Sequence, residues 1–80
     1  MEINLNFFKE VFINSINLSE KDAENLQLES MFEEVPGWDS LGHMRIIAEL
    51  ESQLNVEFEL DEIIGVDTVD KLIQMCLTKK

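Results

Sequence analysis

The stretch GWDSLGHM, residues 37–44, decides how this chain folds, because it starts a helix directly after a turn. Pro36 and Gly37 form a turn sequence, and Asp39 or Ser40 can cap the helix by accepting a hydrogen bond from a backbone N–H. The positive end of a helix dipole favours an anion placed there. A phosphate esterified to the Ser40 hydroxyl would therefore be well placed.

Apolar residues recur at helical spacing on both sides of this stretch. They predict a first helix over residues 4–16, with Asn4 as its N-cap, and a second long helix that begins at Ser40. Further on they predict a short helix over residues 60–64 stopped by Gly65. A last helix then follows, capped by Asp67 or Thr68 and carrying five apolar residues: Val69, Leu72, Ile73, Cys76 and Leu77.

The helix that begins at Ser40 is predicted to be amphipathic. On 3.6 residues per turn, its apolar arc is expected to face the core and consists of Leu41, Met44, Ile47, Ala48, Leu50 and Leu54. The opposite side is expected to face partners and carries Gly42, Arg45, Glu49, Ser52 and Gln53.

Two segments between the helices are predicted to be irregular. Residues 17–38 form a long loop with one short helical turn at residues 19–22, and its scattered apolar side chains are expected to anchor it: Leu18, Leu26, Leu28, Met31, Phe32 and Val35. Apolar and polar residues alternate over residues 54–60, as they do in a β-strand, but the sequence offers no second strand to pair with this segment. We therefore expect an extended crossing that places Leu54, Val56, Phe58 and Leu60 in a helical core.

Composition narrows the class of function. Seventeen acidic and six basic side chains give a net charge of −11, which disfavours nucleic acid and favours partners with basic patches. The single Cys76 with one histidine offers no disulfide and no metal site, so a reducing, cytoplasmic setting is expected. No apolar run approaches the roughly 18 residues of a membrane span, and residues 1–4 lack the basic start of a signal peptide. Eighty residues allow one modest core, and we expect a monomer.

Asp39-Ser40-Leu41, followed by an apolar helix pattern, resembles the attachment motif of acyl carrier proteins; the pattern consists of Met44, Ile47, Leu50, Glu51 and Leu54. The resemblance covers nearly the whole chain. It implies an all-α fold, a small four-helix bundle with a long first loop and a short third helix, and one carrier domain over residues 1–80. In that family a serine carries 4′-phosphopantetheine taken from coenzyme A. Here that serine is Ser40, flanked by Asp39 and Leu41.

The resemblance also implies a carrier rather than an enzyme. Such a carrier holds acyl intermediates as thioesters for fatty-acid, polyketide or other specialised biosynthesis; an aminoacyl or D-alanyl cargo is the alternative. The implied partners are a phosphopantetheinyl transferase, an acyl ligase or acyltransferase, and synthase enzymes with basic docking patches. Asp39, Leu41 and Met44 would form the docking edge, with Arg45 and Glu49 further along. Many fatty-acid carriers have acids where this chain has Gly42 and Arg45, so its partners are expected to differ.

Other interpretations of the same residues stay open from the sequence. Ser40 could be only a helix cap in an acidic interaction module without a prosthetic group. A serine hydrolase is disfavoured, because the nucleophile elbow needs a preceding strand and a sheet that this chain does not supply. No calcium-binding loop motif is present. His43 falls near the apolar arc and is expected to be a packing residue, or else to line the path of a pantetheine arm.

Overall fold

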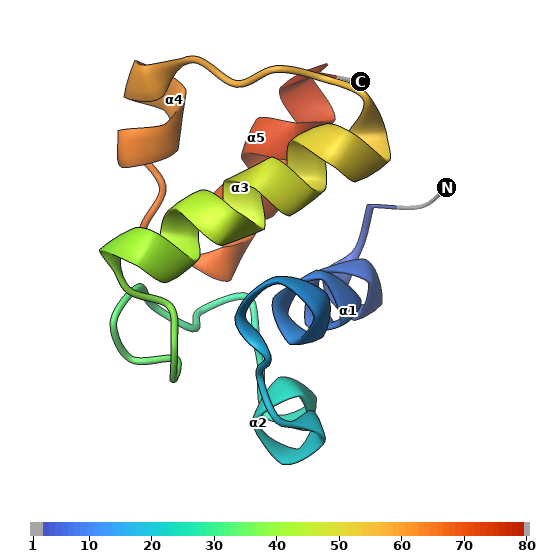
Figure 1. Cartoon of the computed structure of the whole chain (residues 1–80), viewed down its shortest axis with the longest axis vertical. Helices are drawn as coiled ribbons and strands as arrows, with labels where there is room; N and C mark the ends of the chain where they lie inside the picture. Colours follow the sequence, from blue (N-terminus) through green and yellow to red (C-terminus); the bar gives the residue numbers. More distant parts are fainter. Residues whose placement is uncertain (1–2, 80) are drawn as a thin grey trace.

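A computed structural model of the chain describes residues 3–79, and its regular structure there is helical (Figure 1). The helices are α1 (Leu5–Ile16), α2 (Glu20–Glu24), α3 (Ser40–Leu54), α4 (Leu60–Ile64) and α5 (Val69–Lys79). The predicted all-α fold is confirmed. The described residues form five helices where four were expected, because the predicted turn after residue 19 extends into the short helix α2.

Helix α1 begins and ends at asparagines that cap it. The Asn4 side chain accepts a hydrogen bond from the N–H of Phe7 at 3.0 Å, and Asn17 ends the helix in the left-handed conformation at φ 57°. Phe8, Val11 and Phe12 are buried on one face. The predicted first helix and its cap are therefore confirmed.

The loop between α1 and α3 is packed onto the helices. Leu18, Leu26 and Val35 are buried as predicted, but Leu28 and Met31 are exposed, contrary to the prediction. At this point the loop runs antiparallel to the segment that leads into α5 and forms an isolated β-bridge from Met31 to Thr68. Extended backbone sends neighbouring side chains to opposite sides, so pairing there turns part of the segment outward.

Helix α3 packs against α1 with a face that is rotated from the predicted one. Its buried residues are Gly42, His43, Ile46, Ile47 and Leu50. The prediction that Leu41, Met44 and Ala48 face the core is wrong, because all three are exposed. The prediction that Gly42 faces outward is also wrong. The loop that precedes α3 folds back on the first turn and covers that side of the helix.

The chain after α3 follows the predicted crossing only in part. Phe58 is buried and its N–H donates to the Glu51 carboxylate at 2.9 Å, whereas Leu54 and Val56 are half-buried and Leu60 is exposed. Leu60 begins α4 rather than ending the crossing, and it lies on the solvent side of that helix. The predicted stop at Gly65 is confirmed.

Helix α5 closes the core from behind α3 (Figure 1). Thr68 caps its first turn, as its hydroxyl accepts from the N–H of Lys71 at 3.2 Å. Four of the five predicted apolar residues are buried, and Leu77 is exposed. Burial raises the pKa of the Cys76 thiol to about 12, so this side chain stays an uncharged packing group at neutral pH.

Candidate functional site

Ser40 is the first residue of α3 and is exposed to solvent. Asp39 is the N-cap: its carboxylate accepts from the N–H of Gly42 at 2.8 Å, and its carbonyl accepts from the N–H of His43 at 2.7 Å. The cap is thus provided by Asp39, which leaves the Ser40 hydroxyl available. The serine lies at the positive end of a helix of 15 residues.

An apolar cavity of about 420 Å³ opens beside Ser40. Its walls come from the loop, from α3, from α4 and from the segment after α4, and its apolar lining consists of Phe32, Met44, Leu60, Ile63, Ile64 and Val66. Met44, Leu60 and Ile64 are also exposed at its rim, between 49% and 73%. A hydrophobic chain that starts at the Ser40 hydroxyl would find an apolar surface within reach.

The residues predicted for docking do not all gather at this cavity. Met44 lines the cavity beside Ser40, whereas Leu41 and Arg45 line a separate hollow of about 210 Å³ together with Asp39 and Ile16. Ser40 therefore has an apolar rim on one side and a hollow with an arginine on the other. Glu49 lies nine residues along α3, about 14 Å from Ser40 at 1.5 Å per residue, and is hydrogen-bonded to Gln53.

A buried hydrogen-bond relay, which the sequence pattern did not predict, lies behind the cavity. His43 is 8% exposed, which confirms its expected place as a packing residue. Its ring also accepts the indole N–H of Trp38 at Nδ1 (2.9 Å), and its Nε2 lies 3.0 Å from the Ile63 carbonyl oxygen. The only sequence signal was a polar residue at a core position, since buried polar groups require partners.

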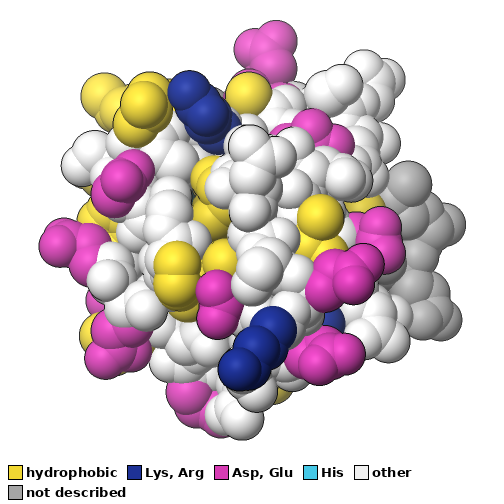
Figure 2. All heavy atoms as spheres, turned by 60° about the horizontal axis from the view of Figure 1, so that its bottom comes forward, with side chains coloured by type: hydrophobic (Ala, Val, Ile, Leu, Met, Phe, Trp, Pro, Cys, Tyr) yellow, Lys and Arg dark blue, Asp and Glu magenta, His cyan; other side chains and the backbone are white. Residues whose placement is uncertain are grey.

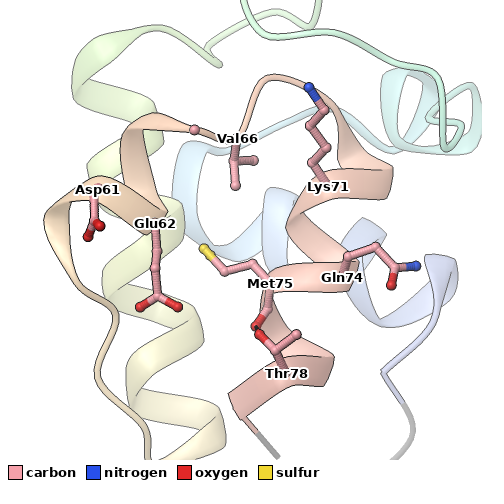
Figure 3. A pocket seen from close by; sticks show the side chains of 8 residues that line it. Asp61, Glu62, Val66, Lys71, Gln74, Met75 and Thr78 are labelled. Atoms are coloured by element: carbon pink, nitrogen blue, oxygen red, sulfur yellow. Dashed lines mark hydrogen bonds between the residues drawn. The ribbon is translucent and has the colours of Figure 1, made fainter.

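A second hollow, of about 370 Å³, separates α4 from α5 (Figure 3). Asp61 and Glu62 reach toward it from α4, and Met75 points into it from α5 (Figure 3). Charged and polar side chains line much of its rim. Helix α4 therefore stands between two hollows, one beside Ser40 and one beside α5.

On the face of the molecule in Figure 2, acidic side chains are spread with hydrophobic side chains between them. This arrangement matches the net charge of −11. Among residues 3–79, no helix is both long and apolar enough to cross a membrane.

Comparison with protein families matches residues 18–76 to the family of the phosphopantetheine attachment site. The chain belongs to this family. The match covers most of the chain and includes the loop, α3, α4 and most of α5. Family membership implies a covalently attached 4′-phosphopantetheine. Comparison with curated proteins found no match.

The residues at the start of α3 fit such a group. A phosphodiester needs an accessible hydroxyl in a field that favours negative charge, and Ser40 provides both. The extended arm needs an accessible surface, which the cavity next to Ser40 supplies.

Proposed function

We propose that Ser40 is the attachment residue and that this chain carries acyl groups through a biosynthetic pathway. The observation that supports the proposal is an exposed serine at the first position of α3, next to an apolar cavity. When bound, the phosphopantetheine supplies a terminal thiol that holds cargo as a thioester. The chain itself performs no chemistry in this proposal, and residues 1–80 act as one carrier domain.

The residues around Ser40 have separate tasks in this mechanism. Asp39 caps α3 and thereby fixes the direction of the Ser40 Cα–Cβ bond, while the first turn of α3 stabilises the negative charge of the phosphodiester. Met44, Leu60 and Ile64 form the exposed apolar rim that an enzyme would cover. Tethering then raises the local concentration of cargo at the bound enzyme.

The apolar lining of the cavity favours an acyl cargo over an aminoacyl one. A hydrophobic chain gains free energy when it leaves water, at about 0.8 kcal/mol per methylene buried. A free amino group would gain nothing from the apolar part of this wall and would lose hydration there. The one carboxylate in the lining, Asp67, is already paired with Lys71 at 3.0 Å. Loading assays with acyl ligases and with amino-acid ligases separate the two cargo classes.

The acidic surface and the apolar rim beside Ser40 indicate which classes of enzyme bind this chain. We propose a phosphopantetheinyl transferase, an acyl ligase or acyltransferase, and synthase enzymes whose basic patches complement the acidic surface. The predicted docking roles of Leu41, Arg45 and Glu49 stay predictions, as do the monomeric state and the cytoplasmic location.

The decisive experiment is enzymatic modification with coenzyme A. We expect a broad-specificity transferase to add one phosphopantetheine to the purified chain and none to Ser40→Ala, as measured by intact mass. Ser52→Ala is the matched control, since Ser52 is an exposed serine on the same helix and should leave the addition complete. Circular dichroism should show equal helix content in all three proteins. A full mass increase in Ser40→Ala would refute the assignment.

A further inference from the structure

The hydrogen bonds of His43 hold its ring between two partners. The indole N–H of Trp38 can only donate, so Nδ1 of His43 accepts and carries no proton. The carbonyl of Ile63 can only accept, so Nε2 carries the proton and donates. One tautomer of the ring satisfies both partners, and the ring thereby joins the loop before Ser40 to helix α4.

Trp38 is a buried anchor for this ring. It is fully buried and packs edge-on against Phe12 and Phe32, with ring centroids 5.1 and 6.0 Å away. Phe32 also packs against the His43 ring, at 5.5 Å between centroids. A side chain that is packed in this way and bonded at both nitrogens has little freedom to turn. The core therefore determines where Nε2 of His43 lies.

Helix α4 depends on this nitrogen because little else attaches it. It is five residues long, and Ile63 is its one buried residue. Within residues 3–79, two polar contacts join α4 to other helices: His43 to the Ile63 carbonyl, and Lys79 to the Glu62 carboxylate at 3.0 Å. The first is buried and the second is partly exposed. The last carbonyls of any helix lack partners within it, so His43 supplies an external cap to α4.

We propose that His43 is a positioning residue for the enzymes that act at Ser40, and that it acts through α4. This inference rests on the proposed function. Leu60 and Ile64 of α4 are exposed and line the cavity beside Ser40, so an enzyme that reaches the serine hydroxyl covers them. The carbonyl that His43 binds is one peptide bond from Ile64. An enzyme binds only those molecules in which α4 is in place, so loss of this bond weakens binding.

Two substitutions at position 43 separate the bond to α4 from the bond to Trp38. His43→Gln keeps an N–H as far along the side chain as Nε2, so it can still donate to Ile63. His43→Asn keeps an acceptor at the place of Nδ1 for Trp38, but its amide ends one bond short of Ile63. We expect α4 amides to exchange with solvent about three- to tenfold faster in His43→Asn than in His43→Gln or the parent, which corresponds to about one hydrogen bond.

The functional measurement is the addition of phosphopantetheine by a transferase supplied with coenzyme A. For His43→Asn we expect the KM for the chain to rise about two- to tenfold with little change in kcat, because the bond places the docking surface and not the reacting atoms. His43→Gln should restore the KM of the parent. Val11→Ala in α1 is the stability control: it removes buried volume and lowers Tm but should leave KM unchanged.

The outcomes distinguish this role from the proposed function. If no addition occurs in the parent or in any variant, the carrier function is refuted and the role of His43 with it. Complete addition with equal KM in the parent and His43→Asn would overturn the positioning role alone, as would equal exchange of their α4 amides. A KM in His43→Gln or in Val11→Ala as high as in His43→Asn would also overturn it, since a general loss of stability then explains the effect.

Discussion

Gly42 is the residue that allows the loop to close over the start of α3. It is buried, and a Cβ atom at this position would overlap the carbonyl oxygen of Gly37 and lie 3.2 Å from Cγ2 of Ile16. Gly37 itself has φ +84°, a conformation that side-chain-bearing residues rarely adopt. The two glycines thus let the backbone before Ser40 press against the first turn of α3.

Gly42→Ala should therefore destabilise the protein, although alanine is the better helix former. Propensity alone would give a gain of about 1 kcal/mol in a helix interior. Overlap with backbone atoms that cannot move aside costs more, and we expect a net loss of about 1–3 kcal/mol. Thermal unfolding checks this, with a fall of at least about 4 °C in Tm.

Gly65→Ala is the control for this prediction. Its Cβ would meet no atom closer than the Asp61 carbonyl oxygen at 3.4 Å, and its φ of −82° suits alanine. We expect its Tm to stay level or rise, since alanine restricts the unfolded chain. If Gly42→Ala were as stable as Gly65→Ala, the close contact with Gly37 would not exist in solution.

Local chemistry explains which residues were predictable. Ser40 at a helix start follows from Asp39 and the turn before it, because a cap is formed within four residues of sequence. The relay through His43 joins positions 5 and 20 residues apart, so no local pattern encodes it. A buried histidine could be predicted; its partners depend on how α4 folds back.

At the scale of helices, the residues at which a helix begins and ends were easier to predict than the face that it buries. The bounds of α1 and α4 and the start of α5 follow from caps and from Gly65. The buried face of α3 was misplaced because periodicity weighs every apolar residue equally and gives glycine no weight. Gly42 is in fact buried, and Ile46 is fully buried although the predicted arc omitted it. Leu41 and Met44, which were predicted to be in the core, are instead exposed on either side of Ser40.

The exposed face of α3 carries a basic residue within an acidic molecule. Arg45 is exposed and lines the hollow beside Asp39 and Leu41. A basic enzyme patch that approaches Ser40 from this side meets like charge, which discriminates against that partner. We therefore expect the chain to serve a specialised pathway and to be a poor substrate for general fatty-acid elongation enzymes.

Arg45→Glu should improve use of the modified chain by such an elongation enzyme, mainly through a faster encounter. Removing repulsion at the rim acts on the association rate, and the gain should shrink as salt screens the charges. The measurement is turnover of both modified proteins at low and at moderate salt. Arg45→Gln is the matched control and should give an intermediate gain. Equal turnover of parent and Arg45→Glu at low salt would contradict the role of Arg45.

At the scale of the whole molecule, stability is a balance between a small core and a repulsive surface. The core joins α1, α3 and α5 with the loop, and Trp38 packs edge-on against Phe12 at 5.1 Å between ring centroids. Repulsion among the acidic side chains opposes this packing, since the 80 residues carry a net charge of −11. Within the described residues, Lys71–Asp67 and Lys79–Glu62 are the ion pairs that form, so most carboxylates have no cation beside them.

Salt should therefore stabilise this protein. Screening weakens the two ion pairs, but ion pairs at a protein surface contribute little to stability, whereas relief of repulsion acts on all the unpaired acids together. We expect Tm to rise by several degrees between low and moderate salt, since about 1 kcal/mol corresponds to about 4–8 °C in a domain of this size. Glu29→Gln combined with Glu57→Gln removes two exposed acids and should raise Tm at low salt while it reduces the gain from added salt. If Tm instead falls as salt is added to the parent, attraction within the two pairs outweighs repulsion, and the acidic surface does not limit stability.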